Sequence, residues 1–387
     1  MNKLLFFYIL FLISSINSLA QTNLEKGDIV VVGVNAETTS CYNNPSNIID
    51  AVYILALKNI TNGTIIDVTD NAWQRNIDNR FSKNEGTLRF TRTGGTIAAG
   101  TIFQINFTTY NSNTNTYNTT LTNNNSGWDV STISISSNTT GLNFAVNGDQ
   151  LLFMTDGAWN NGNGNTSNAQ YNSLSGKTAK ILFGYNSKNA WNNLNDDSGD
   201  SALPGDESND PSAFDIKLHH YTTSSTVTNA TRRYQNYNGP WTLATKEEWY
   251  MRVLNPSNWI ATEYCNNFNN NLSNSPIQIL TSINEIIVCK DDIVNLKVDS
   301  NSIVTYQWYS NDENSTQGGT LIAGANSATF NPPTSIAGTK YYYCIMKYTL
   351  RWRDNSTPKE AVSESIYSLV YKVTVNQIDT SSIQQIP

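Results

Sequence analysis

The chain is short of charged side chains, and it carries fewer basic than acidic ones. Charged residues make up 14% of its 387 residues, whereas a typical soluble domain has roughly 25%. Twenty-four Lys and Arg against 31 Asp and Glu give a net charge of −7. Because clustered cations that release counterions supply much of the affinity for nucleic acids, we expect neither nucleic acid nor an anionic membrane surface as a partner.

Histidine is almost absent, which narrows the chemistry available for catalysis. The only two are the neighbours His219 and His220, and neighbours on a strand point to opposite faces of a sheet. They would therefore seldom serve one metal ion or one catalytic base together. No Gly-x-Ser-x-Gly nucleophile motif accompanies them, and we assign no catalytic residue.

A long apolar run with targeting features occurs only at the N-terminus. Lys3 precedes the apolar stretch 4–16, and the sequence Ser-Leu-Ala over 18–20 has the small-x-small pattern of a cleavage site. The run is short for a membrane span, so we predict that 1–20 is a signal peptide and expect no membrane insertion after its cleavage. Cleavage would remove one Lys and no acidic residue, changing the net charge from −7 to −8. We expect a secreted or cell-surface protein.

Cysteine is scarce but even in number, as Cys41, Cys265, Cys289 and Cys344. In an exported protein an even number favours structural disulfides, and none of the four has zinc-ligand spacing. Cys289 and Cys344 fall in one segment of the chain, and Cys41 and Cys265 lie at the two ends of the other. We therefore predict two disulfides among these residues.

A polar, Asn-rich stretch divides the chain. Residues 266–276 read NNFNNNLSNSP and offer little to bury. We predict an N-terminal domain over 21–265, a linker over 266–276, a second domain over 277–376 and a C-terminal tail over 377–387.

Short apolar runs rich in β-branched residues dominate the predicted N-terminal domain, with Gly, Asn and Asp between them. Runs with this rhythm are typical of a β-sandwich or barrel. We predict strands over 29–34, 48–57, 64–68, 87–91, 102–107, 132–135, 151–154 and 181–185.

One helix is expected near the end of the predicted N-terminal domain. Thr245 and Glu248 match a capping box, and Trp249 and Val253 follow on one helix face. The dipeptide Asn-Pro at 255–256 is expected to end the helix.

The second predicted domain alternates apolar and polar residues along three strands. The inward rows are expected to be Val294, Leu296 and Val298; Val304, Tyr306 and Trp308; and Tyr342, Cys344 and Met346. A buried Trp, a Cys in a late strand and a Tyr two positions before it match the immunoglobulin pattern.

Residues 285–375 resemble the immunoglobulin-like modules of secreted proteins in type IX-secreting bacteria. The motifs are VC at 288–289, YQWY at 306–309, GTLIAGA at 319–325 and YYYC at 341–344. The resemblance implies an immunoglobulin-like sandwich. Because Cys289 precedes the strand over 292–298, a disulfide would join the preceding segment to the Cys344 strand, and closing that loop would stabilise by about 4 kcal/mol.

The predicted N-terminal domain resembles an exported β-domain found beside such modules. The motifs are GDIV at 27–30, GTII at 63–66 before DNAW at 70–73, EGTL at 85–88 and GDQL at 148–151. The strand-and-turn rhythm is also similar to a lamin-tail-type sandwich. Neither resemblance implies a catalytic motif. The predicted fold class is all-β, with two β-sandwich domains, the second immunoglobulin-like.

Paired carboxylates could hydrolyse a glycosidic bond, and Asp67, Asp70 and Glu85 follow or flank apolar strands. Asp67 and Asp70 have opposite parity in a continuous strand, so a turn would be needed before both faced one place. The structural alternative, which we favour, is that Asp70-Asn71 caps that turn through side-chain hydrogen bonds.

Calcium is the one cofactor that the sequence suggests. Asn195, Asp197, Asp200 and Asp206 lie in an acidic stretch, and calcium binds six to eight oxygen ligands. The spacing does not match an EF-hand, and a solvated loop is the structural alternative.

Aromatic side chains in polar loops suggest a surface that binds sugar rings. Trp159 lies in a Gly- and Asn-rich run, and Trp128 and Trp191 have similarly polar neighbours. Aromatic faces pack on sugars while amides and carboxylates bond the hydroxyls. Trp249 and Trp308 are instead expected in the core.

We therefore expect a secreted or cell-surface adhesion protein, non-enzymatic, that recognises a glycan or a cell-surface protein. The alternatives are a secreted polysaccharide hydrolase that uses carboxylates of the N-terminal domain, and a purely structural spacer.

Overall fold

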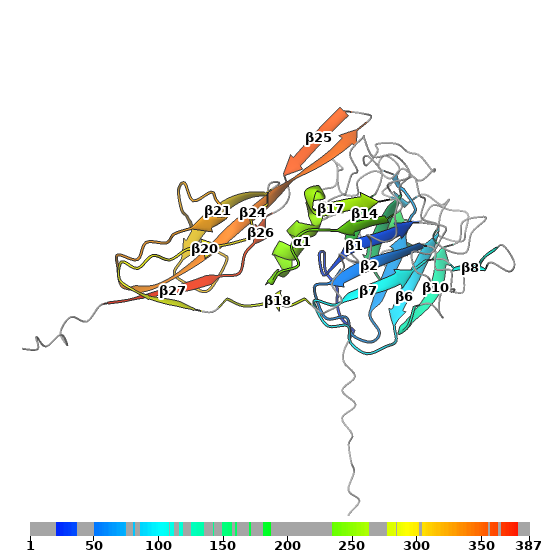
Figure 1. Cartoon of the computed structure of the whole chain (residues 1–387), viewed down its shortest axis with the longest axis horizontal. Coiled ribbons are helices and arrows are strands. Elements are labelled where there is room, and N and C mark those ends of the chain that lie inside the picture. Colours follow the sequence, from blue (N-terminus) through cyan, green and yellow to red (C-terminus); the bar gives the residue numbers. More distant parts are fainter. Residues whose placement is uncertain are drawn as a thin grey trace, which may run out of the picture.

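The protein is all-β, with one α-helix in the part of the chain that the structure describes (Figure 1). The computed structural model describes residues 21–36, 50–74, 80–81, 86–107, 109–111, 116–118, 125–134, 142, 149–156, 159–160, 170–171, 181–186, 234–262, 277–283, 285–301, 304–354, 357–362 and 365–377. Within these ranges, no helix has the length and hydropathy needed to cross a membrane. The predicted signal peptide lies outside them.

Two antiparallel five-stranded sheets form the N-terminal part, which we define as 21–262. The first has the order β17-β15-β1-β2-β7, with bounds Trp259–Thr262, Tyr234–Tyr237, Ile29–Ala36, Asp50–Ala56 and Ile102–Asn106. The second has the order β10-β6-β3-β11-β14, with bounds Trp128–Ser134, Thr87–Arg92, Ile65–Thr69, Gln150–Thr155 and Ile181–Asn186. β1 and β2 are buried along their whole length, which agrees with the apolar runs 29–34 and 51–56 within them.

Contacts between these two sheets give the N-terminal part a sandwich-like core. Phe90 of β6 packs edge-on against Phe107, which follows β7, with 6.5 Å between ring centroids. The hydroxyl of Tyr185 in β14 donates a hydrogen bond of 2.5 Å to the Oε1 atom of Gln235 in β15. Shorter strands complete this part: Trp73–Gln74 (β4), Arg80–Phe81 (β5), Thr109–Asn111 (β8), Thr116–Asn118 (β9), Trp159–Asn160 (β12) and Gln170–Tyr171 (β13).

The predicted helix is confirmed as α1, Lys246–Leu254. The Thr245 hydroxyl accepts from the Glu248 N–H at 3.1 Å, and the Glu248 carboxylate accepts from the Thr245 N–H at 2.9 Å, which completes the capping box. Trp249 is fully buried. Asn255 caps the C-terminal end, and a 3-10 turn over Pro256–Asn258 follows.

A seven-stranded sheet forms most of the C-terminal part, which we define as 277–377. Its order is β19-β27-β24-β21-β22, with bounds Ile286–Cys289, Tyr371–Asn376, Gly338–Asp354, Val304–Asn311 and Thr320–Leu321. Thr357–Val362 (β25) and Ile366–Tyr367 (β26) also pair with β24, and Leu296–Lys297 (β20) pairs with Thr329–Phe330 (β23). The predicted inward residues are buried or partly buried, and Trp308 is fully buried.

Strand β24 is unusually long, at 17 residues. Its pairing with β21 ends where Tyr348 lies opposite Val304. Beyond that point, from Thr349 onward, it pairs only with β25, and this hairpin projects from the body of the sheet (Figure 1). We call the hairpin, residues 349–362, the β24–β25 arm.

Helix α1 joins the two parts (Figure 1). The Arg252 guanidinium, on α1, forms an ion pair with Asp299 of the C-terminal part and donates to the Thr242 carbonyl at 2.7 Å. The Asp299 N–H donates to the Glu248 carboxylate at 2.8 Å. The short parallel pair of Ala244–Thr245 (β16) and Ile279–Leu280 (β18) adds a second connection. One continuous set of buried apolar side chains therefore runs through both parts.

The predicted disulfide between Cys289 and Cys344 is wrong for this structure. Cys289 pairs with Asn376 at the end of β27, and the neighbouring Val375 lies opposite Gly338. Cys344 is six residues further along β24, roughly 20 Å at the rise of a strand, whereas a disulfide needs Cα atoms within about 7 Å. Both thiols are free, Cys289 exposed and Cys344 buried. Cys41 and Cys265 lie outside the described residues.

The two thiols should therefore differ in their reactivity toward an alkylating reagent in the native protein. We expect iodoacetamide to modify Cys289, which is exposed, and to leave Cys344 unmodified until the protein is denatured, because burial raises the pKa of the Cys344 thiol to about 12 and the thiolate is the reactive form. Peptide mapping by mass spectrometry before and after denaturation measures this. A disulfide between the two would show instead as protection of both peptides until reduction.

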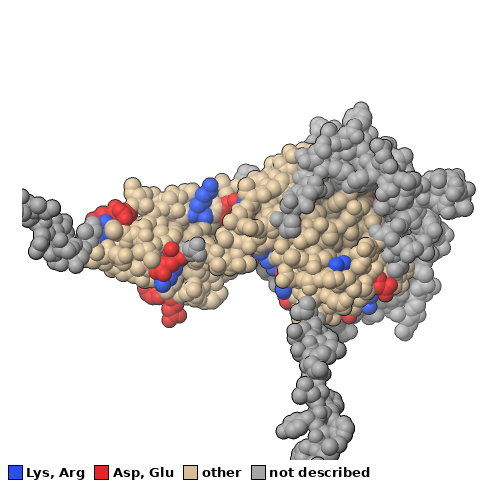
Figure 2. All heavy atoms as spheres, turned by 60° about the horizontal axis from the view of Figure 1, so that its bottom comes forward, with Lys and Arg blue, Asp and Glu red and all other residues tan. Residues whose placement is uncertain are grey.

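Charged side chains are sparse on the surface. On the face shown in Figure 2, Lys and Arg lie in small groups close to Asp and Glu, with wide uncharged areas between the groups. Asp28, unlike these surface groups, is buried. Its carboxylate lies 3.2 Å from the Lys58 ammonium and also forms an ion pair with Lys246, the first residue of α1.

Candidate functional site

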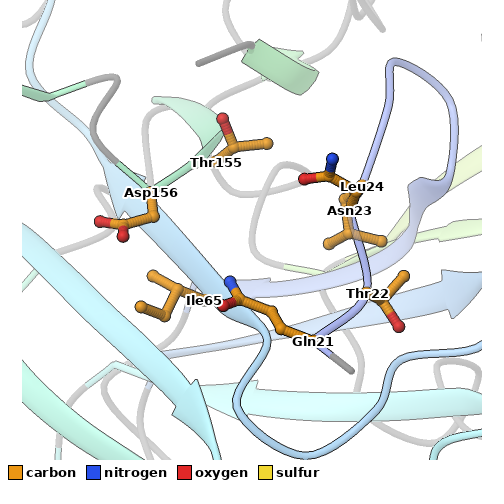
Figure 3. A pocket seen from close by; sticks show the side chains of 7 residues that line it. All are labelled: Gln21, Thr22, Asn23, Leu24, Ile65, Thr155 and Asp156. Carbon is orange, nitrogen blue, oxygen red and sulfur yellow. The ribbon is translucent and has the colours of Figure 1, made fainter. Parts of the chain in front are cut away.

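A polar pocket of about 370 Å³ opens between the first described residues and the second sheet. It is lined by Gln21, Thr22, Asn23, Leu24, Ile65, Thr155 and Asp156. Figure 3 shows residues 22–24 on one side and Ile65 and Asp156 on the other, with the Gln21 side chain extending toward Ile65. The pocket therefore combines amide, hydroxyl and carboxylate groups with two apolar side chains.

Hydrogen bonds to residues 58–64 hold the segment that carries Gln21 and Asn23 in place. The Thr22 N–H donates to the Thr64 hydroxyl at 3.1 Å, and the Thr22 hydroxyl donates to the Asn59 carbonyl at 2.9 Å. Lys58 donates to the Asn23 carbonyl at 2.7 Å. These bonds fix the backbone and leave the side-chain amides of Gln21 and Asn23 at the pocket.

The opposite wall depends on three residues from adjacent strands, which we call the Arg89 cluster: Asp67 of β3, Arg89 of β6 and Asp156 after β11. Asp67 lies directly opposite Arg89 in the β3–β6 register. The Arg89 guanidinium donates to both Asp67 oxygens at 2.8 and 2.9 Å, and lies 2.7 Å from an Asp156 oxygen. One cation thus holds two carboxylates, one of them at the pocket.

Burial divides the roles of the two carboxylates. The side chain of Asp67 is fully buried and that of Asp156 is 49% exposed, with Arg89 at 28% between them. Burial raises the pKa of Asp67 although its bonds to Arg89 act in the opposite direction. The pKa of Arg89 is raised, chiefly by its hydrogen bond to Asp67, so Arg89 stays cationic. Asp156 is therefore the carboxylate of the cluster that can accept hydrogen bonds from a ligand, and its ion pair with Arg89 orients it.

No protein-family model matches the chain, and no curated protein gives a significant match. The resemblances stated for 285–375 and for the predicted N-terminal domain therefore stay predictions.

Two of the three carboxylates singled out from the sequence lie in the protein interior and not at an open site. Asp67 and Asp70 are both buried, and the Asp70 carbonyl accepts from the Gln150 amide at 2.5 Å. The turn after β3 is held by Thr69 and Asn71, because the Asn71 N–H and side-chain amide donate to the Thr69 hydroxyl at 3.1 and 2.9 Å. Glu85 lies outside the described residues.

Trp128, predicted to be an exposed ligand-binding residue, is a core residue. It is 4% exposed and stacks on Phe103, with 5.7 Å between ring centroids. Phe90 packs against its edge, and the Arg92 guanidinium lies 5.3 Å from its ring centroid. The polar neighbours misled the prediction, because strand alternation places exposed Asp129 on the opposite face from Trp128.

The other predicted site residues lie wholly or partly outside the described structure. The backbone of Trp159 belongs to β12 and pairs with Tyr171, but its side chain is outside the description. Trp191 and the predicted calcium ligands Asn195, Asp197, Asp200 and Asp206 also lie outside it. The described residues contain no group of three or more His, Cys, Asp or Glu side chains that could hold a metal ion.

Sequence reasoning missed Arg89 and Asp156. The sequence did contain one signal for this cluster, Asp67, because a carboxylate inside a buried strand is normally paired with a cation. Identifying Arg89 as that cation needed the β3–β6 register, and identifying Asp156 needed β11 on the other side of β3.

Proposed function

We propose that this is a secreted or cell-surface binding protein whose N-terminal part recognises a sugar unit of a glycan in the pocket beside Asp156. The observation that carries the proposal is the half-exposed Asp156 carboxylate, which Arg89 holds in the lining of a polar pocket. The proposal assumes that the protein is exported, and this assumption rests on the predicted signal peptide over 1–20.

The lining chemistry supports a hydroxylated ligand. A carboxylate accepts hydrogen bonds from hydroxyl groups, and the amides of Gln21 and Asn23 can both donate and accept. Ile65 and Leu24 supply the apolar contact that a sugar ring also needs. A pocket of about 370 Å³ is near the lower end of the range of small-ligand sites, about 300–1,000 Å³.

The same geometry favours binding over glycoside hydrolysis. Hydrolysis by paired carboxylates needs two of them flanking the scissile bond. In the Arg89 cluster, Asp67 is fully buried behind Arg89 and only Asp156 reaches the pocket. Among the described residues that line the pocket, Asp156 is the one carboxylate, and the Arg89 guanidinium already neutralises it in part.

The remaining parts of the chain have a supporting role in this proposal. The C-terminal part, with its resemblance to immunoglobulin-like modules, would serve as a spacer or a second binding unit. Its junction with the N-terminal part through Arg252 and Asp299 would hold the pocket in a constant orientation.

A glycan array tests the proposal on the chain that starts at Gln21, with calcium and again with chelator. Asp156→Asn should bind any glycan hit about 10- to 100-fold more weakly, because hydrogen bonds to charged groups contribute roughly 1.5–3 kcal/mol. The matched control is Asp129→Asn, which changes an exposed carboxylate of β10 outside the pocket. Calorimetric titration of the hits gives the affinities.

Two outcomes would count against the proposal. Equal affinity of Asp156→Asn and wild type would place glycan binding away from the pocket. An array without binding in either buffer would favour protein partners or a structural spacer. Binding that disappears with chelator would make the predicted calcium stretch, 195–206, part of recognition.

A further inference from the structure

The small sheet of the C-terminal part consists of two strands in the described residues, β20 and β23. It packs against the seven-stranded sheet, because the Phe330 ring of β23 stacks on Trp308 of β21 with 5.7 Å between centroids. Leu296 of β20 lies opposite Phe330, and Lys297 lies opposite Thr329. Among the described residues, β23 therefore has a strand on one edge and none on the other, and an open edge is a place where another strand can pair.

The hydrogen bonds of β23 determine which backbone groups face this open edge. The Val298 N–H donates to the Ala328 carbonyl at 2.9 Å, so the Ala328 backbone groups point toward the β20 side. Because this direction alternates along an antiparallel strand, the backbone groups of Thr329 and Asn331 point away from β20. The Thr329 N–H has one contact, 3.5 Å to the Ser327 hydroxyl, which is longer than a good hydrogen bond.

A pocket of about 480 Å³ borders residues 329–331, which we call the β23 edge. Its other walls are Asn295, beside β20, and residues 322–327. The Gln307 side-chain amide, on β21, donates to the Ile322 carbonyl at 2.8 Å and ties this wall to the seven-stranded sheet. The wall is therefore fixed before a ligand arrives, which lowers the entropy cost of binding.

The lining of this pocket is uncharged. It carries the amides of Asn295, Asn326 and Asn331, with apolar contact from Ile322 and Phe330. The Asn295 amide donates to the Asn331 side-chain oxygen at 2.9 Å, so the Asn295 oxygen and the remaining Asn331 N–H groups can bond a ligand. A charged ligand group would lose hydration here without meeting an opposite charge, and the pocket therefore favours an uncharged ligand with both donors and acceptors.

The β23 edge distinguishes between the two ligand classes that such a lining could accept, a neutral sugar and a peptide. The outward backbone groups of Thr329 and Asn331 are two residues apart, about 6.7 Å along the strand. An extended peptide carries its own N–H and C=O pairs at the same repeat, whereas the hydroxyl groups of a sugar chain do not. The open backbone groups therefore favour a peptide.

We propose that the β23 edge binds an extended, uncharged segment of a partner protein, which adds a third strand to the sheet of β20 and β23. The peptide backbone exchanges hydrogen bonds with Thr329 and Asn331, and a side chain of the peptide enters the pocket beside Asn295. In this mode of recognition, main-chain hydrogen bonds supply affinity and the side-chain pocket supplies specificity. The site is separate from the pocket at Asp156 and does not depend on the proposed function.

A displayed library of random peptides, selected on the chain that starts at Gln21, tests the proposal. Synthetic copies of the selected peptides are then measured by calorimetry with an N-methyl group on one peptide bond at a time. Methylation of the amides that donate to the β23 edge should weaken binding about ten-fold, because each change removes a main-chain hydrogen bond and adds a steric clash. Methylation of the amides between them should leave the affinity almost unchanged, which gives an alternating pattern along the peptide.

Thr329→Pro tests the same bonds on the protein side. Proline removes the outward N–H of this position, and a strand edge tolerates proline where the N–H does not bond within the sheet. We expect about ten-fold weaker peptide binding, with thermal unfolding as the check that the variant is folded. Thr329→Val is the matched control, because it keeps the N–H and the β-branched shape, and it should bind like the wild type. Asp156→Asn should also bind like the wild type, which separates the two sites.

Several results would overturn the proposal. They are a library from which no peptide is selected, a methylation scan without alternation, and unchanged affinity of a folded Thr329→Pro variant. Self-association of the wild type that Thr329→Pro abolishes, measured by analytical ultracentrifugation, would make a second copy of this chain the occupant in place of a partner protein.

Discussion

A Trp308→Ala variant is expected to lose about 3–5 kcal/mol of the free energy of unfolding. Trp308 is fully buried, and its ring lies 5.7 Å from those of both Phe330 and Tyr371. Its indole N–H donates to the Ser327 carbonyl at 2.8 Å. The substitution leaves a cavity beside Phe330 of β23 and Tyr371 of β27, and it removes the hydrogen-bond donor of the Ser327 carbonyl. Urea unfolding followed by tryptophan fluorescence and circular dichroism measures the loss.

The control for this experiment is Ile293→Ala in the same part of the chain. Ile293 is 89% exposed, and surface substitutions change stability by less than about 0.5 kcal/mol. If Trp308→Ala cost as little as Ile293→Ala, Trp308 would not be the centre of this core, and the inward alternation of β21 would be wrong.

The next largest effect is expected for Arg252→Ala, with a loss of about 2–3 kcal/mol. Removing one partner of a fully buried ion pair costs about 3–5 kcal/mol, and we expect less here because the Asp299 side chain is 28% exposed. Arg252 also lies over the Trp249 ring, 4.8 Å from its centroid, and donates to the Thr242 carbonyl. Since these contacts connect the two parts, we expect unfolding to broaden or divide into two transitions.

Arg92→Ala is a matched control for the junction. Arg92 also lies over a tryptophan, 5.3 Å from the Trp128 centroid, but its hydrogen bonds go to the carbonyls of Gly95 and Gly127. We expect a loss of about 1–2 kcal/mol with the transition still single. A single, sharp transition for Arg252→Ala would show that Arg252 does not couple the two parts.

The strands that could be predicted are those with local signals. The runs over 87–91 and 151–154 are confirmed as β6 and β11 with boundaries within one residue, because β-branched and aromatic residues there are bounded by Gly, Asn or Asp. The capping box of α1 is likewise a local signal. The run predicted over 132–135 began too late, since β10 starts at Trp128.

The strands and contacts that escaped prediction depend on distant partners. β15 has the polar sequence Tyr-Gln-Asn-Tyr, yet all four residues are buried. Gln235 is accommodated there by the Tyr185 hydroxyl, 50 residues away. The Arg89 cluster also depends on the order of three strands that are not consecutive in the chain. The full length of β24 did have a local signal, because no Gly, Pro, Asn or Asp interrupts 339–353.

The parallel pairing of β19 with β27 has a mechanical consequence. β19 lies near the start of the C-terminal part and β27 at its end, and they pair in parallel over four residues each. Tension between the two ends of this part would pull the two strands past each other and load all the hydrogen bonds between them together. In an antiparallel terminal hairpin, the same tension would instead break the hydrogen bonds between the strands one after another. We therefore expect the C-terminal part to resist stretching along the chain.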